Sequence, residues 1–184
     1  MNTRAVEWKC DNENQLMPGC LRIIDQTLLP GKLEFIDIND IESLWNAIKN
    51  LQVRGAPAIG VAAAMGIASA MQNSPAKTIA ELHKETISAC DYIATSRPTA
   101  VNLFRALDRI KKRINDCSQQ NTSVESAKEA LVKESIAIGA EDAEMCEAIG
   151  RHGASLLKDG DTIITHCNAG ALATSGIGTA LSPI

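Results

Sequence analysis

Apolar side chains recur at helical spacing through most of the chain, which predicts a predominantly helical protein. Asn39 or Asp40 can cap a first helix that runs to about Asn50, because both side chains accept hydrogen bonds from a first helical turn. Amphipathic patterns predict further helices over residues 78–95 and 123–158. Glycines are expected to bend or divide the last of these, at positions Gly139, Gly150 and Gly153. Its expected apolar face carries Leu131, Ile138, Met145, Ile149 and Leu156.

Two more helices are expected to begin at prolines, since the fixed backbone of proline suits the first helical turn. Pro57 opens an uncharged segment that is apolar on all sides, as in a buried helix packed closely through Gly60 and Gly66. Pro98 opens an amphipathic helix. The inward stripe expected on that helix consists of Val101, Phe104, Leu107, Ile110 and Ile114.

Short segments near both ends of the chain follow the pattern of strands. The segment that begins at Leu21 is β-branched, and residues 32–36 alternate between polar and apolar side chains. A Pro-Gly turn at residue 30 separates them, so they predict a small antiparallel sheet. The β-branched run from Thr162 to Thr165 predicts a buried strand, followed by a loop of small residues and a helix start.

Composition is typical of a soluble globular protein, with 45% hydrophobic and 22% charged residues. The net charge of −4 gives no electrostatic reason to expect binding to nucleic acid or to an anionic membrane. The apolar run after Pro57 is rich in Ala and Gly, which drive membrane insertion weakly. The six cysteines form no Cys-x-x-Cys pair, and neither they nor the three histidines show zinc-ligand spacing. Free thiols in the cytoplasm are therefore expected.

Arginines stand just ahead of both proline-started helices. Arg54 is either a surface arginine before a tight turn or part of an anion site, in which Gly55 and Ala56 offer backbone N–H groups and Arg54 the charge. Arg97 has the same relation to Pro98. Two such helix starts in one small domain predict a phosphate or another anionic ligand.

His166 and Cys167 end the predicted C-terminal strand. Cys167 fits two interpretations equally well: a small buried hydrophobe, or a nucleophile whose thiolate is favoured by the helix start that follows. His166 could act as a base, although packing is the commoner role. Alternation along a strand places it on the opposite side from Cys167.

Four motifs resemble, in the expected order and over essentially the whole chain, the signatures of the S-methyl-5-thioribose-1-phosphate isomerase family. They are Ile24-Asp-Gln-Thr-Leu-Leu-Pro30, Val53-Arg-Gly-Ala-Pro-Ala-Ile-Gly60, Ser96-Arg-Pro-Thr-Ala-Val-Asn-Leu103 and Thr165-His-Cys-Asn-Ala-Gly-Ala-Leu-Ala-Thr174. The resemblance implies an aldose–ketose isomerase of methionine salvage, which converts methylthioribose 1-phosphate to methylthioribulose 1-phosphate. It also implies a homodimer without a metal or organic cofactor.

Carried over motif by motif, the resemblance makes Cys167 the catalytic cysteine and makes Arg54, Gly55, Ala56 and Arg97 substrate-binding residues. Family members are longer, and their second half supplies an acid aspartate, to which no residue of this chain corresponds. The 184-residue chain is therefore expected to lack appreciable isomerase activity by itself.

The expected fold class is α/β and rich in helix. Residues 1–158 would form a mostly helical N-terminal domain with a small antiparallel sheet, and residues 159–184 the first strand of an incomplete Rossmann-like domain. A parallel strand without its neighbours cannot be buried on both faces, so residues 161–184 are expected to pack poorly.

Two alternatives come from the same superfamily. One is a ribose-1,5-bisphosphate isomerase, against which the segment Asn168-Ala-Gly-Ala-Leu-Ala-Thr174 argues. The other is a non-catalytic interaction protein, similar to regulatory subunits of the eukaryotic guanine-nucleotide exchange factor for translation initiation. The joint presence of Cys167, Arg54 and Arg97 argues against that class. A third alternative is a remnant that folds as a helical module and has no activity, which thermal stabilisation by the sugar phosphate would distinguish from a surviving half-site.

Overall fold

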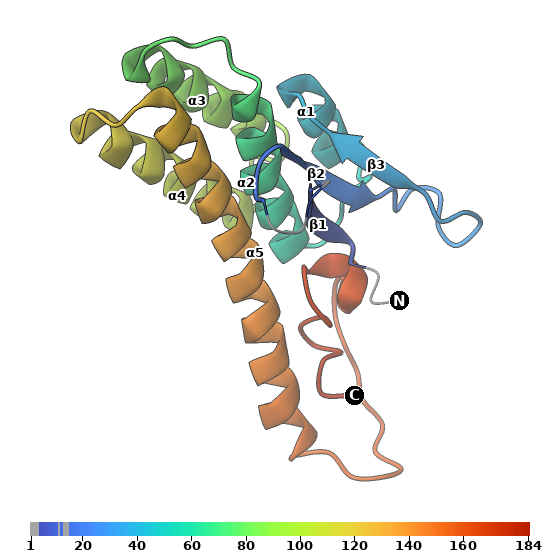
Figure 1. Cartoon of the computed structure of the whole chain (residues 1–184). Helices are drawn as coiled ribbons and strands as arrows, with labels where there is room; N and C mark the ends of the chain where they lie inside the picture. Colours follow the sequence, from blue (N-terminus) through green and yellow to red (C-terminus); the bar gives the residue numbers. More distant parts are fainter. Residues whose placement is uncertain (1–3, 11, 13–14) are drawn as a thin grey trace.

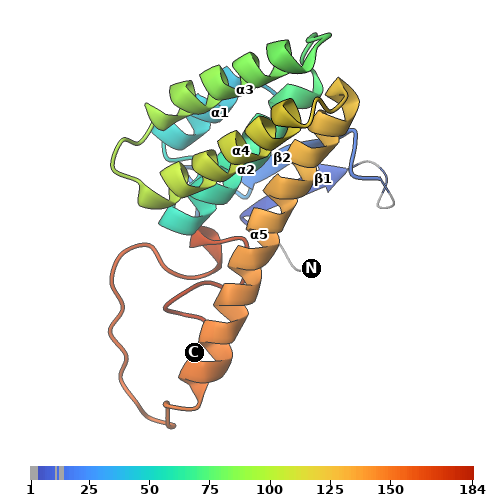
Figure 2. The ribbon, with the colours of Figure 1, turned by 90° about the vertical axis from the view of Figure 1, so that its left-hand side faces the viewer.

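The computed structural model describes residues 4–10, 12 and 15–184. In this part of the chain, helices α1 to α4, the first half of α5 and a small sheet pack together, while the second half of α5 extends away from them (Figure 1). The chain then leaves α5, runs back to the start of α2, and returns along α5 to its C-terminus (Figure 2). No helix of the described residues has the length and apolar character needed to cross a bilayer.

The sheet of the described residues has the strand order β1-β2-β3, with β1 at Val6–Cys10, β2 at Gly19–Ile24 and β3 at Phe35–Ile38. Both strand pairs are antiparallel. The predicted sheet is confirmed as the β2–β3 pair, although β3 starts at Phe35 rather than at residue 32. The first strand was not predicted from the sequence.

Local side-chain caps fix the starts of α1 (Ile41–Lys49) and α3 (Ile79–Ala94). Both helices were predicted, and so was the cap of α1, but the cap of α3 was not. Asp40 Oδ1 accepts a hydrogen bond of 2.8 Å from the N–H of Ser43. This hydrogen bond lowers the pKa of Asp40, against the effect of its partial burial. In α3 the hydroxyl of Thr78 and the carboxylate of Glu81 form a capping box.

Helix α2 (Ala56–Gln72) is the central element, and every residue from 58 to 69 is buried. Its glycines allow close approach, as expected. A methyl group on Gly66 would lie 2.5 Å from the side chain of Leu44, and one on Gly60 would lie 2.8 Å from the backbone oxygen of Asn102. The prediction of a helix buried on all sides is confirmed.

Helix α4 (Val101–Gln119) begins later than predicted, because Pro98 lies in the turn before it and Ala100 is the N-cap. The predicted stripe is also partly wrong, since Val101 is 68% and Phe104 38% exposed. The rest of the stripe is confirmed, since Leu107, Ile110 and Ile114 are buried. In the first turns of the helix, contact with the neighbouring helices buries Leu103 and Ala106 in place of Val101 and Phe104.

Helix α5 (Val124–Ala154) is continuous, so the predicted break at Gly150 or Gly153 is wrong. The glycines of this helix serve close packing. A methyl group on Gly139 would lie 2.8 Å from Met65 Cε, and one on Gly150 would lie 2.9 Å from the backbone oxygen of Ser182. The expected apolar face fails in the last turns of the helix and beyond, because Met145 is 58% exposed and Leu156 lies after the end of α5 and is 79% exposed.

The strand predicted from Thr162 to Thr165 is not formed in the described structure, where residues 161–166 are neither helical nor extended in a sheet. Ile164 is 94% exposed. A strand requires a neighbour for its backbone hydrogen bonds, and no described strand pairs with this segment. Farther on, the short helix η1 (Ala171–Ala173) and the residues after it pack against α2 and α5.

Candidate active site

Arg54 lies in the loop that leads into α2 and is half-buried. Its Nη2 donates a 2.6 Å hydrogen bond to the backbone oxygen of Gln26. Its Nε is buried and has no hydrogen-bond partner among the described residues. A buried N–H group without an acceptor is costly, so this arginine is set up to receive one.

Gly55 is the N-cap of α2, and two constraints restrict its position to glycine. Its φ of 97° is unfavourable for residues with a side chain. A methyl group there would also lie 2.5 Å from the backbone and side chain of Ala173 in η1. The N–H groups of Gly55 and Ala56 belong to the helix start, where the backbone leaves donors unpaired.

Gln26 connects the Arg54 loop with the segment that carries Cys167. It is only 2% exposed. Its backbone N–H donates to the oxygen of Gln52 at 2.9 Å, and its side-chain Nε2 donates to the oxygen of Leu172 at 2.7 Å. The opening motif, the loop before α2 and η1 therefore meet at one residue.

Asp25 fixes the backbone beside Gln26. It is 7% exposed and accepts hydrogen bonds from the N–H and hydroxyl of Thr27 and from Gln52 Nε2, at 3.0, 2.6 and 2.8 Å. Burial acts to raise the pKa of Asp25, but these hydrogen bonds outweigh it and the pKa is lowered. Asp25 is therefore an ionised anchor whose oxygens are already occupied, which does not suit a general acid.

Arg97 lies in the turn between α3 and α4, where its backbone oxygen accepts a hydrogen bond from the N–H of Ala100. Its half-buried side chain forms no hydrogen bond or ion pair with any described residue. Because Gly60 packs on Asn102, the first turns of α2 and α4 lie next to each other. Arg54 and Arg97 thus precede two adjacent helix starts, and both retain free N–H groups.

Cys167 is exposed and has a φ of 67°. The predicted setting of this cysteine is wrong in two respects: no strand ends at it, and the helix start that follows is the single turn η1 at Ala171. No described contact joins Cys167 or His166 to either arginine. Only the far end of the same segment, at Leu172 and Ala173, is attached to the Arg54 loop.

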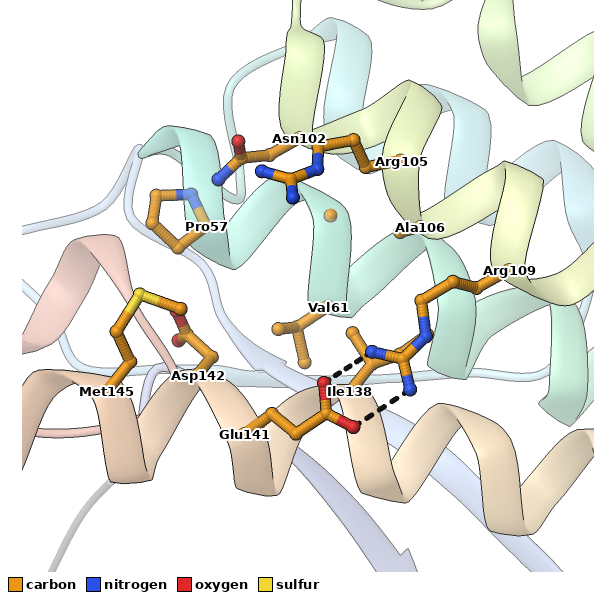
Figure 3. Close-up of a pocket in the computed structure, with 11 residues that line it drawn as sticks. Pro57, Val61, Asn102, Arg105, Ala106, Arg109, Ile138, Glu141, Asp142 and Met145 are labelled. Carbon is orange, nitrogen blue, oxygen red and sulfur yellow. Dashed lines mark hydrogen bonds and ion pairs between the residues drawn. The ribbon is translucent and has the colours of Figure 1, made fainter.

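A cavity of about 190 Å³ lies between α2, α4 and α5, beside the start of α2 (Figure 3). Pro57 and Val61 line it from α2, and Asn102 and Arg105 reach toward it from α4. Its remaining residues are Gly60, Ala106, Arg109, Ile138, Glu141, Asp142 and Met145. The Arg109–Glu141 ion pair lies at one end, with Nη2 donating to Oε1 at 2.9 Å.

The electrostatics of this region favour an anion. Arg105, like Arg97, has no ion-pair partner among the described residues, and both stand near positive helix ends. Two carboxylates also line the cavity: Glu141 is paired with Arg109, while Asp142 accepts a hydrogen bond from the neutral Ser175 and keeps its negative charge. No three His, Cys, Asp or Glu side chains of the described chain converge in the way that a metal site requires.

Sequence reasoning missed Gln26, Asn102 and Arg105 as members of this region. Gln26 and Asn102 both lie inside motifs that had been singled out, but their spacing carries no sign of their burial or contacts. Arg105 is one helical turn after Val101, on the face of α4 that looks toward α5. Only the packing of α2 against α4 and α5 brings Asn102 and Arg105 to the cavity beside the start of α2.

The fold and this arrangement of loops are those of a known class of protein. The chain is similar to the crystal structure of 5-methylthioribose 1-phosphate isomerase from Pyrococcus horikoshii OT3, with a TM-score of 0.85 and 40% identity, over 97% of this chain and 47% of that one. Residues 52–183 match the Initiation factor 2 subunit family. The chain belongs to that family.

Two kinds of sugar-phosphate isomerase are similar to the chain in sequence. The 5-deoxyribose 1-phosphate isomerase of Petrotoga mobilis is 54% identical over 89% of this chain and 47% of its own length. The methylthioribose-1-phosphate isomerase of Geobacter sulfurreducens is 44% identical over 100% of this chain and 50% of its own length. A structure of translation initiation factor eIF-2B, subunit delta, from A. fulgidus has a TM-score of 0.78 and 41% identity. The chain thus spans about half the length of the curated relatives it matches.

Proposed function

We propose that this chain carries the N-terminal half of an aldose–ketose isomerase, which converts S-methyl-5-thioribose 1-phosphate to S-methyl-5-thioribulose 1-phosphate in methionine salvage. The observation that carries the proposal is Arg54, whose buried Nε at the start of α2 has no acceptor among the described residues. A phosphate oxygen supplies such an acceptor. The 44% identity to methylthioribose-1-phosphate isomerase over the whole chain supports the same reaction.

In this proposal the sugar's phosphate binds at the paired helix starts. The guanidinium groups of Arg54 and Arg97 and the N–H groups of Gly55 and Ala56 would hold its oxygens. Fixing the phosphate in this way positions the carbon atoms C1 and C2 of the sugar for reaction. Cys167 is the proposed catalytic residue, and its attached segment must carry it to the sugar.

The chemistry defines what else the site needs. A phosphate on C1 locks the ring, so the ring oxygen must be protonated before hydrogen moves from C2 to C1. Cys167 would then act as the base or stabilise the charge that develops, in a proton-transfer or a hydride-shift route. We place the acid in a Rossmann-like half that would follow residue 158. A homodimer and a cytoplasmic location complete the proposal.

A second candidate substrate is 5-deoxyribose 1-phosphate, which lacks the methylthio group on C5. The observation in its favour is that two relatives named 5-deoxyribose 1-phosphate isomerase are 54% and 51% identical to the chain. Both substrates carry the same phosphate and the same C1 and C2 chemistry. The residues that contact C5 would decide between them.

Thermal unfolding of the 184-residue chain tests phosphate recognition. We expect S-methyl-5-thioribose 1-phosphate or 5-deoxyribose 1-phosphate to raise the Tm, because a ligand that binds only the folded state stabilises it. The Arg54→Gln variant should lose this shift, and the larger shift identifies the preferred sugar. Ribose, which lacks the phosphate, is the control. A chain that neither sugar phosphate stabilises would contradict the proposal.

Turnover tests the placement of the acid. When the 184-residue chain alone is incubated with S-methyl-5-thioribose 1-phosphate, we expect ¹H NMR to show no appreciable formation of the ketose product. Turnover at the rate of a full-length relative would show that the acid lies within this chain after all.

A further inference from the structure

Gln26 binds two segments of the proposed site, the Arg54 loop through its backbone and the Cys167 segment through its side chain. Its backbone oxygen accepts the 2.6 Å hydrogen bond from Arg54 Nη2. Its side-chain Nε2 donates the 2.7 Å hydrogen bond to the oxygen of Leu172, five residues beyond Cys167. These contacts join positions 28 and 146 residues apart in the sequence.

Hydrogen bonds around its own loop also restrain Gln26. Asp25, Thr27 and Gln52 form a hydrogen-bonded cluster around its backbone, and the N–H of Gln26 donates to Gln52 at 2.9 Å. The side chain is 2% exposed, so water does not compete for its amide. Gln26 therefore bridges the Arg54 guanidinium and η1, and the length of this one buried residue sets the distance between them.

We propose that Gln26 is a positioning residue that fixes Arg54 relative to the Cys167 segment, so that binding of an anion at Arg54 is transmitted to that segment. The inference rests on the proposed function, which supplies the anion: the phosphate of the sugar. An anion that orders Arg54 also orders the Gln26 backbone, and the side chain passes this restraint to Leu172. The cysteine segment is then held most firmly when the phosphate is in place.

The segment has two other attachments. Ala173 packs against Gly55 beside Arg54, but no hydrogen bond joins these two residues in the described structure. Ser175 attaches it to α5, where its hydroxyl donates to the Gly139 oxygen at 2.6 Å and its N–H donates to Asp142 at 2.8 Å. These bonds hold the segment to the long helix and do not involve Arg54. Among the described residues, the hydrogen bond from Gln26 is the one that ties η1 to the Arg54 loop.

Hydrogen–deuterium exchange of the 184-residue chain tests the proposal, with inorganic phosphate as the probe. The reporter is a peptide covering residues 168–178, which contains the N–H of Ala173, bonded to the Gly170 oxygen at 2.9 Å. In Gln26→Leu we expect exchange in this peptide about tenfold faster, since a buried hydrogen bond is lost. We also expect phosphate to slow this exchange in the natural sequence but not in the variant.

Gln72→Leu is the matched control, because Gln72 also holds backbone groups. Its side chain accepts from the N–H of Gly19 at 3.1 Å and donates to the Gly19 oxygen at 2.8 Å, at the other end of α2. It should lower the Tm as Gln26→Leu does, but leave exchange of residues 168–178 and its response to phosphate unchanged. Gln26→Glu, which keeps the size and removes the amide donor, should behave like Gln26→Leu.

The outcomes separate this inference from the proposed function. Unchanged exchange of residues 168–178 in both Gln26 variants would overturn the positioning role, whatever phosphate does. Equal acceleration in the Gln72→Leu control would overturn it too, because the effect would then be one of general stability. If phosphate does not slow the exchange of residues 168–178 in the natural sequence, both the anion site and its coupling to the cysteine segment are contradicted. Faster exchange in the Gln26 variants would still assign the positioning role.

Discussion

Gly55 shows how much of this site depends on single residues. It gives the chain a φ of 97° just before α2 and leaves room for Ala173 of η1. Beside it, Arg54 keeps a buried Nε without an acceptor among the described residues. The unpaired Nε does not stabilise the free protein, and its burial is understandable if it receives an oxygen atom of a ligand.

Gly55→Ala should destabilise the fold by about 3 kcal/mol, from backbone strain and from the overlap with Ala173. Gly160→Ala is the matched control. Gly160 also has a positive φ, of 86°, but nothing lies within 4 Å of its added methyl group, so strain alone should cost about 1 kcal/mol. Urea unfolding measures both values. Equal losses would show that η1 does not press on Gly55.

At the scale of elements, charged side chains align strands and helices with one another. Asp37 on β3 faces Arg22 on β2, and the two are register partners. Between helices, Glu134 of α5 accepts hydrogen bonds from Arg109 and Arg113 of α4. Arg109 also binds Glu141, about two turns farther along α5 than Glu134. These bonds orient the helices that frame the cavity beside α2.

The Asp37 pair predicts a pH dependence. The hydrogen bond from Arg22 lowers the pKa of Asp37 from 3.8 to about 2, against burial and with help from Lys9. A carboxyl group whose folded pKa is depressed stabilises the fold above its unfolded pKa, and that stability is lost as the pH falls from about 4 to 2. Because Asp37 is 33% exposed, the change should stay below about 1 kcal/mol.

Urea unfolding between pH 5 and pH 2.5 measures this contribution. Asp37→Asn should be less stable than the natural sequence at pH 5 and approach it at pH 2.5. A constant difference between the two proteins over this interval would contradict the assigned cause.

Glu134→Gln should cost about 1–3 kcal/mol, because the side chain is 11% exposed and serves two arginines. Its hydrogen bonds from Arg113 and Arg109 overcome the effect of burial and lower its pKa. Glu129→Gln is the control, since the exposed Glu129–Lys133 pair on the same helix should contribute less than about 0.5 kcal/mol. Thermal unfolding compares the two, and similar losses would count against the α4–α5 network.

On the scale of the whole molecule, the packed body around α2 contrasts with the exposed end of α5 and the segment after it (Figure 1). Large apolar side chains lie in solvent there, including Leu156, Ile164 and Ile184 at 79%, 94% and 72% exposure. The segment nevertheless returns to cover Cys146, which is 1% exposed. Its docking on α2 and α5 therefore decides which cysteines solvent can reach.

Alkylation of the native chain should modify Cys167 first, because it is exposed, while Cys146 and Cys90 stay protected. Burial also raises the pKa of the Cys90 thiol to about 12, which suppresses its reactive thiolate. Iodoacetamide treatment followed by peptide mass spectrometry measures the order. Cys167→Ser is the control that removes the fast site. Fast labelling of Cys146 in the native protein would mean that residues 174–178 are not docked on α5.

The sequence by itself determined the helical elements whose signals are local. The Asp40 cap, the Thr78–Glu81 box and the apolar run after Pro57 each act within a few residues, so α1, α2 and α3 were predictable. The same holds for the arginines at 54 and 97, because their relation to helix starts is visible in the chain. The motifs also indicated the family before any contact was known.

Only the tertiary structure decided which distant residues meet. The strand predicted from Thr162 to Thr165 is not formed, because a strand depends on neighbouring strands for its hydrogen bonds. The glycines of α5 pack closely against other segments, which no local pattern indicates. Gln26 looked isolated in the sequence, yet burial between Arg54 and Leu172 makes it the junction of the proposed site. Such junctions form from contacts across more than a hundred residues, which no local pattern records.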